Sequence, residues 1–296
     1  MIRASFLTQP VARRLAIAAA VALTAVALAA HRAGSAPAAG NSSPGVMPAG
    51  DGSGATPFSG PITHADRDHA GMSLSPKAAS SLAIAAAVTR TRGMDVSGWQ
   101  GNVNWSLAKA NGARFAFIKA TEGTSYRNPY FGQQYVGSYN VGMIRGAYHF
   151  ALPDRSTGTA QADYFVSHGG GWSRDGRTLP PALDIEYNPY GSRCYGKTAS
   201  GMVAWIRAFS NEVRYRTSRY PVIYSTRDWW VNCTGNSAAF GATNPLWIAC
   251  YCSTAGTLPA GWSFYTFWQF ASSGLLPGDQ DYFNGAYTRL QVLATG

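Results

Sequence analysis

Two carboxylates separated by one residue end the apolar run LPPALDIE at residues 179–186. The run predicts a buried strand, so Asp184 and Glu186 share one face, about 6 to 7 Å apart at their Cα atoms. When two acids lie at such a short distance in a partly dry site, their repulsion raises the pKa of at least one of them. A carboxyl that stays protonated near neutral pH can act as a general acid. A solvated strand end that caps the next element has the same pattern, and the two acids alone do not decide between these interpretations.

The elements that must position these acids form an alternating series of strands and helices. Strand-like runs are GMDVS (93–97), FAFIKAT (115–121), GMIRGAYHF (142–150), LPPALDIE (179–186), PVIYST (221–226), PLWIACY (245–251) and FYTFWQF (264–270). The clearest predicted helix covers residues 198–218, with apolar side chains at three- and four-residue spacing, and shorter helices fit 105–111, 129–140 and 157–168. This pattern predicts an α/β domain built as an irregular (β/α) TIM-like barrel. The alternative is an open doubly wound sheet, which no G-x-G-x-x-G or Walker-type loop supports.

In a barrel of this kind, functional side chains lie at the carboxyl ends of the strands. Asp95 lies near the end of the first run, and Asp279 and Asp281 follow the last one. Polar and aromatic side chains end the other runs: Lys119, Glu122, Tyr148, His149, Tyr224, Trp247, Tyr251, Trp268 and Gln269. Acids ringed by aromatics suit a carbohydrate groove, because sugar faces stack on aromatic rings and hydroxyls need polar partners.

Some of these side chains also have a purely structural interpretation. Lys119 and Glu122 fit an ion pair that holds a loop as well as they fit substrate contact. His149 should point away from its neighbour Tyr148, so we expect it to be a packing histidine and not a metal ligand. No metal or organic cofactor is indicated.

The N-terminal region predicts export. Basic residues, a 16-residue apolar stretch and then small residues fit a signal peptide over residues 1–36, with cleavage between 29 and 36. A membrane anchor is the alternative, but the stretch is short and consists mostly of alanine, so we expect no stable membrane association. Residues 37–92, rich in Gly, Ala, Ser and Pro, predict a disordered spacer or propeptide, which leaves a single catalytic domain over 93–296.

The charge of the domain is modest. The whole chain carries a net charge of +10, but residues 93–296 contain 16 basic and 11 acidic side chains, a net charge of +5. This excludes a nucleic-acid-binding stripe. A basic exported domain would be steered toward anionic wall polymers, although solubility explains the same charge equally well. We expect a secreted monomer.

All four cysteines lie inside the domain, and an exported protein can oxidise them. Three complete pairings are possible. Cys250 and Cys252 are two residues apart in a predicted strand, where their Cα separation is near the upper limit for a bridge, so that bond would be strained. Cys194 with Cys233 is the favoured pair.

Several motifs together resemble glycoside hydrolase family 25, the Chalaropsis-type lysozymes, and in particular exported bacterial N-acetylmuramidases. Asp95, Gln100, Gly101 and Gly112 lead to FIKATEGTSYRN (117–128), and GAYHF (146–150), ALDIE (182–186), NPLWIA (244–249), FWQF (267–270) and D-x-D-x-F-N-G (279–285) follow in the family's order. The resemblance covers essentially all of residues 93–296.

The resemblance implies a secreted enzyme that hydrolyses the β-1,4 bond between N-acetylmuramic acid and N-acetylglucosamine in bacterial peptidoglycan, with net retention. It implies that Glu186 is the proton donor, that Asp184 is its carboxylate partner, and that Asp95 and Asp279 line the site. Substrate-binding candidates are Tyr148, Tyr224, Trp247, Gln269, Lys119 and Glu122. Asp281 stands where the family also accepts Asn, and we interpret it as a turn residue.

Two other functions compete with this one. A barrel that binds wall glycans without cutting them would have lost the acidic pair, which is present here. Another barrel glycosidase, such as a chitinase, would be expected to have a longer acidic motif and a larger domain.

Overall fold

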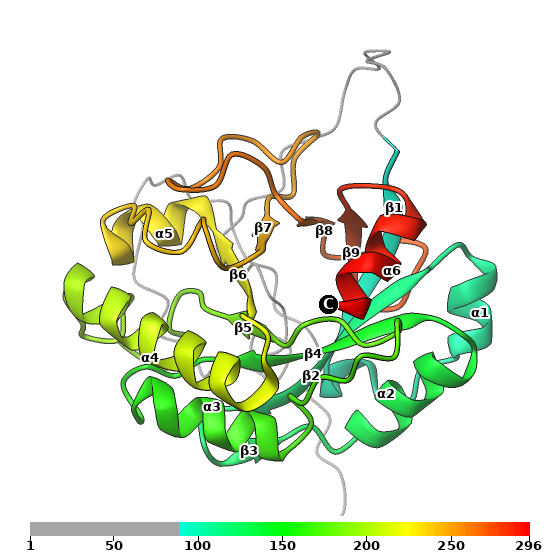
Figure 1. Cartoon of the computed structure of the whole chain (residues 1–296), viewed down its shortest axis with the longest axis horizontal. Coiled ribbons are helices and arrows are strands. Elements are labelled where there is room, and N and C mark those ends of the chain that lie inside the picture. Colours follow the sequence, from blue (N-terminus) through cyan, green and yellow to red (C-terminus); the bar gives the residue numbers. More distant parts are fainter. Residues whose placement is uncertain (1–88) are drawn as a thin grey trace, which may run out of the picture. The chain divides into compact units, whose positions relative to one another are not determined.

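The computed structural model describes residues 89–296, and these form the domain shown in Figure 1. The predicted signal peptide and residues 37–88 of the predicted spacer lie outside the described residues. The first strand, β1 (Thr91–Val96), begins two residues before the expected domain start at Gly93. Within residues 89–296, no helix is both long and apolar enough to span a bilayer.

Eight strands close into a barrel, as predicted. They are β1, β2 (Phe115–Glu122), β4 (Ile144–Phe150), β5 (Ala182–Asp184), β6 (Val222–Thr226), β7 (Leu246–Ala249), β8 (Phe267–Ala271) and β9 (Asp279–Phe283). A two-residue strand, β3 (Tyr126–Arg127), pairs with β2 at the margin. The barrel closes because β1 pairs with β2 on one side and with β9 on the other. The alternative of an open doubly wound sheet is therefore wrong.

The last strand departs from the parallel pattern. β9 runs antiparallel to both β8 and β1, whereas the other barrel strands are parallel to their neighbours. The amino end of β9 therefore meets the carboxyl ends of the other strands, and Asp279 pairs directly with Asp95 of β1. Residues 279–283 were not predicted to form a strand.

Helices surround the barrel: α1 (Trp105–Ala110), α2 (Phe131–Asn140), α3 (Gly158–Ser167), α4 (Ala199–Thr217), α5 (Arg227–Thr234) and α6 (Tyr287–Thr295). A short 3-10 helix, η2 (Gly98–Gln100), follows β1. The four predicted helices are α1 to α4, each within about two residues at its ends, and α5 and α6 were not predicted. Thr198 begins α4, where its hydroxyl accepts a hydrogen bond from the Gly201 N–H (3.2 Å). Such a cap satisfies an amide that the first helical turn leaves unpaired.

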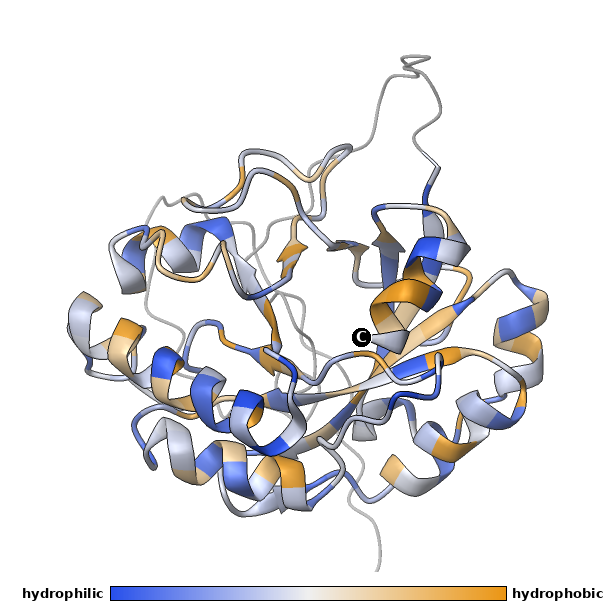
Figure 2. Ribbon diagram, viewed as in Figure 1, coloured by the Kyte–Doolittle hydropathy of each residue, from blue (hydrophilic) through white to orange (hydrophobic). Residues whose placement is uncertain are grey.

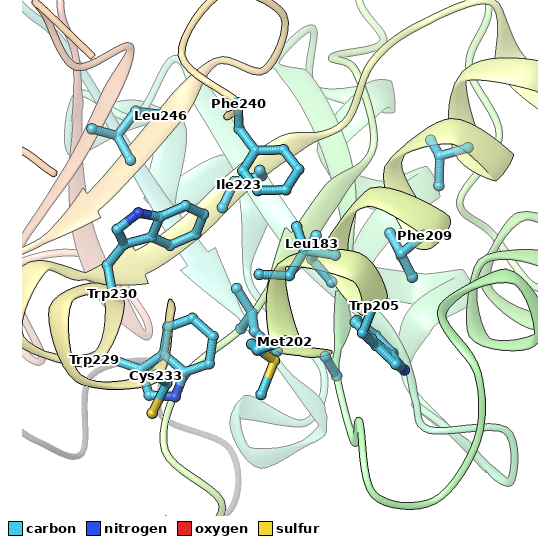
Figure 3. Packing of buried hydrophobic residues seen from close by; sticks show 14 of the residues in the cluster. Leu183, Met202, Trp205, Phe209, Ile223, Trp229, Trp230, Cys233, Phe240 and Leu246 are labelled. Atoms are coloured by element: carbon cyan, nitrogen blue, oxygen red, sulfur yellow. The ribbon is translucent and has the colours of Figure 1, made fainter. Parts of the chain in front are cut away.

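The largest buried cluster fills the space between the outer face of the strands and helices α3 to α5. Figure 3 shows Met202, Trp205 and Phe209 of α4 near Leu183 of β5 and Ile223 of β6. The three- and four-residue spacing in α4 produces this contact, because it places these side chains on one side of the helix. In Figure 2, α4 accordingly alternates between hydrophobic and hydrophilic positions.

A second cluster occupies the barrel interior. It contains Phe115 and Phe117 of β2, Tyr224 of β6, Trp247 of β7 and Phe267 of β8, among others. Leu290 and Ala294 of α6 belong to the same cluster. Because α6 follows the carboxyl end of antiparallel β9, it packs at the rim opposite Asp95 and Asp279.

The structure contains the predicted Cys194–Cys233 disulfide, which joins the loop before α4 to α5. It also contains a Cys250–Cys252 disulfide with a Cα separation of 5.2 Å. The expectation of a strained bridge assumed that the strand continued through residue 251. Since β7 ends at Ala249 and the chain turns there, the two Cα atoms lie within the ordinary range for a disulfide.

Candidate active site

The two acids that end the LPPALDIE run lie at the carboxyl end of β5. Asp184 is the last residue of the strand, and Glu186 follows it. Pairing to β6 continues beyond the strand, because the Ile185 N–H donates to the Tyr224 carbonyl (3.1 Å) and the Ser225 hydroxyl donates to the Ile185 carbonyl (2.9 Å). Ile185 packs in the outer cluster together with Leu183. The alternation therefore continues, and it directs the two carboxyls to the inner side.

Both carboxyls are buried, at 1% exposure for Asp184 and 2% for Glu186. Neither oxygen of Asp184 has a hydrogen-bond partner among the described residues. Burial raises the pKa of Asp184 well above its ordinary value, the Glu186 carboxylate raises it further, and the Lys119 ammonium acts in the opposite direction. Two like charges in a dry site favour a state in which the pair holds one proton between them. This is the charge state that acid catalysis needs.

Lys119 and Glu122 form an ion pair, with 2.8 Å between Nζ and Oε2. The Tyr190 hydroxyl donates to the other Glu122 oxygen (2.6 Å). The Lys119 ammonium also lies 4.9 Å from the centre of the Phe150 ring. The structural interpretation of the pair thus holds, and contact of either side chain with substrate stays a prediction.

Gln269 of β8 connects Asp95 to two tyrosines. Its amide nitrogen donates to Asp95 Oδ2 (2.8 Å), and its amide oxygen accepts from the hydroxyls of Tyr224 (3.0 Å) and Tyr251 (3.1 Å). The nitrogen and the oxygen of this amide thus both bond to site residues, and the bond from the nitrogen orients the Asp95 carboxyl. The Tyr251 hydroxyl also approaches Asp279 Oδ2 at 3.5 Å.

Asp281 is not the turn residue that we expected. It lies inside β9 with 0% exposure, and its Oδ1 accepts a hydrogen bond from Trp247 Nε1 (2.9 Å). Burial raises the pKa of Asp281 well above its ordinary value, and the nearby Asp95 adds to this effect. The prediction was wrong because alternate residues Asp279, Asp281 and Phe283 share the inner face of a strand that had been interpreted as a loop.

The predicted sugar-stacking aromatics form the floor of the site. Trp247 stacks on Phe117, with 4.6 Å between ring centres, and meets Tyr148 and Tyr224 edge-on. All three predicted aromatics are at most 2% exposed. These three side chains are therefore part of the buried core of the barrel, and direct contact with a sugar stays a prediction.

His149 lies on the opposite side of β4 from Tyr148, as expected. Its two ring nitrogens hydrogen-bond to Thr121 (2.8 Å) and Gln161 (2.9 Å), and its ring stacks on Phe209. Burial lowers its pKa to about 4, so the ring is neutral at neutral pH. Within residues 89–296, no group of three or more His, Cys, Asp or Glu side chains is arranged to hold a metal ion.

The structure adds Tyr190 to the site and gives Tyr251 and Asp281 contacts that were not predicted from the sequence. Tyr251 ends a predicted strand, but its hydroxyl contacts could not be foreseen without the turn after β7. The sequence around Asp281 could have predicted its position, since DQDYF alternates acidic and other residues as a strand with one polar face does.

Comparisons with known proteins cover the same segment. The profile of the family described as Glycosyl hydrolases family 25 matches residues 94–279, which include Asp95, Asp184, Glu186 and Asp279. Lysozyme M1 of Streptomyces globisporus is 50% identical over 208 residues, which are 69% of this chain and 71% of that protein. N,O-diacetylmuramidase of Chalaropsis sp. is 50% identical over 209 residues, which are 69% of this chain and 99% of that protein.

Solved structures agree in fold. A family GH25 lysozyme from Aspergillus fumigatus gives a TM-score of 0.69 at 51% identity and covers 70% of this chain and 100% of its own. A bacterial lysozyme from Streptomyces coelicolor gives a TM-score of 0.68 at 50% identity and covers 69% of this chain and 97% of its own. Sequence and fold are therefore shared over the part of the chain that carries the buried acids.

Proposed function

This chain belongs to glycosyl hydrolase family 25 and is a lysozyme-type glycoside hydrolase, and from that premise we propose that Glu186 protonates the bond that it cleaves. The proposed substrate bond is the β-1,4 linkage between N-acetylmuramic acid and N-acetylglucosamine in bacterial peptidoglycan. The observation that carries this proposal is the buried Asp184 and Glu186 pair at the carboxyl end of β5, which favours one shared proton.

Cleavage of a glycosidic bond requires a proton on the leaving oxygen and stabilisation of an oxocarbenium-like centre. In our proposal, the carboxyl of Glu186 donates the proton. Asp184 stabilises the positive centre, either by attacking the sugar carbon directly or by orienting the substrate's own 2-acetamido oxygen for the attack. Both routes give net retention, which we propose for this enzyme.

Asp95 and Asp279 complete the proposed site. They are paired neighbours on β1 and β9, and Gln269 and Tyr251 hold their oxygens. We propose that they line the sugar-binding surface next to the acidic pair. The fixed orientation of these acids supports this role, because preorganised polar groups need no rearrangement when charge develops in the transition state.

We further propose that the protein is secreted and acts as a monomer, with a catalytic domain that consists of the predicted residues 93–296 and the two preceding residues of β1. The sequence pattern of residues 1–36 and the spacer-like composition of residues 37–92 support export and dispensability of the spacer. The net positive charge of the domain supports attraction to anionic wall polymers. Purified protein that starts at residue 89 should lyse walls as fast as protein that starts at residue 37.

Digestion of purified peptidoglycan, followed by mass spectrometry of the new reducing ends, tests the function. The proposal predicts N-acetylmuramic acid at the new reducing ends. N-acetylglucosamine ends would indicate another glycosidase, and binding without any new ends would indicate a non-catalytic glycan-binding barrel.

A further inference from the structure

Tyr251 lies between two cysteines that are bonded to each other. The segment Cys250, Tyr251, Cys252 follows β7 directly, so it stands at the carboxyl rim where the proposed catalytic carboxyls gather. The Cα atoms of the two cysteines are 5.2 Å apart. In a strand that continued in the direction of β7, they would be about 6.4 to 6.8 Å apart. The disulfide therefore closes a small ring in which the chain turns at Tyr251.

One side of this ring is fixed to the neighbouring strand. The Cys250 N–H donates to the Gln269 carbonyl (3.1 Å), and the Cys250 carbonyl accepts from Trp268 Nε1 (2.9 Å). Cys252 is exposed. Cys250 thus belongs to the framework of the barrel, and the bond to Cys252 restrains the chain on the other side of Tyr251.

The Tyr251 hydroxyl reaches two groups of the site. It lies 3.1 Å from Gln269 Oε1 and 3.5 Å from Asp279 Oδ2, and Gln269 in turn donates to Asp95. Burial raises the pKa of Tyr251, and the carboxylates of Asp279 and Asp95 raise it further. The phenol therefore keeps its proton at neutral pH and remains a hydrogen-bond donor.

A second tyrosine contacts the same amide from inside a strand. Tyr224 donates to the same Gln269 oxygen (3.0 Å), but it lies inside β6, whose backbone is paired with β5 and β7. Tyr251 follows the end of β7, and the bond from Cys250 to Cys252 spans it. A side chain beyond the end of a strand loses conformational freedom when it forms a hydrogen bond, and a cross-link reduces that cost.

We propose that the Cys250–Cys252 disulfide positions Tyr251 so that its hydroxyl, which donates to Gln269 and lies beside Asp279, keeps the Gln269 amide in the orientation that turnover requires. Tyr251 is a positioning residue in this account. The proposal rests on the glycosidase function described above and names the elements that keep its carboxyls in place.

A double-mutant cycle on peptidoglycan turnover tests this proposal. Its members are the wild type, Tyr251→Phe, the pair Cys250→Ser with Cys252→Ser, and the three substitutions combined. Tyr251→Phe and the cysteine pair should each lower kcat about tenfold, with KM changed less than about twofold, because each removes the same hydrogen bond. The combined variant should lose no more than either one alone.

The second disulfide of the protein supplies the control. Cys194→Ser with Cys233→Ser should lower Tm, and any effect on kcat should multiply with that of Tyr251→Phe, because that bridge joins the loop before α4 to α5 and does not span Tyr251. Unchanged kcat after removal of Cys250–Cys252, or losses that multiply with those of Tyr251→Phe, would overturn the proposal while leaving the glycosidase function intact. A wild type that releases no new reducing ends would overturn the function, and the proposal with it.

If the cysteine variants do not fold, the folded wild type offers the same test. A dithiol passes two electrons and two protons to the Cys250–Cys252 bond, which gives two thiols, and the dithiol becomes a cyclic disulfide. The exposed Cys252 makes this bond more accessible than the one at buried Cys233. Alkylation and mass spectrometry identify the opened bond. We expect the tenfold loss of kcat only when the Cys250–Cys252 bond opens, and recovery of kcat after reoxidation. Full activity of the protein with this bond opened would contradict the proposal.

Discussion

The two ends of the barrel interior differ in chemistry although the same strands form both. Toward the amino ends of the parallel strands, inward positions hold Phe115, Phe117, Val222 and Phe267. Two residues further along each strand, inward positions hold Lys119, Tyr224 and Gln269, and Asp95, Asp184, Asp279 and Asp281 lie toward the same end of the barrel. We call the first set the apolar layer and the second the polar layer. A single step of two residues along a strand thus separates positions that stabilise the fold from positions that can perform chemistry.

The largest expected effect is the loss of activity when Glu186, which lies next to the polar layer, is changed. Glu186→Gln removes the proposed proton donor but keeps its shape, so kcat should fall by about 10²- to 10⁴-fold with little change in Tm. Peptidoglycan turnover and thermal unfolding measure the two effects. Glu212→Gln on α4 is the matched control and should retain activity. Near wild-type turnover of Glu186→Gln would show that the proton comes from elsewhere.

The apolar layer should respond in the opposite way. Phe117 contacts both Trp247 (4.6 Å) and Phe267 (5.1 Å) between ring centres, so Phe117→Ala leaves a cavity and should lower the free energy of unfolding by about 3 to 5 kcal/mol. Urea unfolding measures this loss. Tyr215→Ala, at a position that is 82% exposed, should change it by less than about 0.5 kcal/mol. Equal losses for the two variants would contradict the division into layers.

Buried His149, outside the barrel interior, predicts one direction of pH dependence. Its pKa is about 4 in the folded protein against 6.5 as its ordinary value, so the unfolded chain binds the additional proton between these values. The free energy of unfolding should therefore fall as the pH drops from 6.5 to about 4, by about 3 kcal/mol in total. Unfolding at a series of pH values should show this slope in the wild type and not in His149→Asn. Parallel curves for the two proteins would contradict the assignment.

The raised pKa of Asp184 predicts a pH dependence of stability in the opposite direction, and this is the smallest expected effect on stability. Because its pKa is raised in the folded protein, the native state binds the additional proton, and stability falls as the pH rises above about 4, the ordinary value for this side chain. Asp184→Asn should thus raise Tm at pH 7, with a gain that disappears toward pH 4, while activity is lost. A variant that is less stable than the wild type at pH 7 would show that the charged form of Asp184 is well solvated.

The apolar layer explains how much of the fold could be predicted from the sequence. Seven barrel strands were located because their inward and outward positions are both largely apolar, and α4 because its apolar side chains recur at helical spacing. β9 was missed because two of its three inward positions are Asp279 and Asp281. A strand that carries the polar layer looks like a loop until its partners are known.

The site, too, could be predicted only in part from the sequence. The sequence brought Asp95, Asp184, Glu186 and Asp279 to one rim, because strand ends meet in a barrel. It could not give the links between them, since the contacts of Gln269 depend on the register of β8 against its neighbours and those of Tyr251 on a turn after β7. The aromatic side chains beneath the carboxyls were identified as site residues, but their burial follows from packing that only the closed barrel defines.

The central claim is that Glu186 supplies a proton to the leaving oxygen, and the dependence of the rate on the leaving group tests it most directly. When a dinitrophenyl glycoside of the N-acetylated sugar chain is cleaved, the leaving dinitrophenolate needs no proton. The leaving sugar oxygen of peptidoglycan does need one. The account predicts that Glu186→Gln loses about 10²-fold or more on peptidoglycan but less than about tenfold on the dinitrophenyl glycoside. Equal losses on both substrates would contradict it.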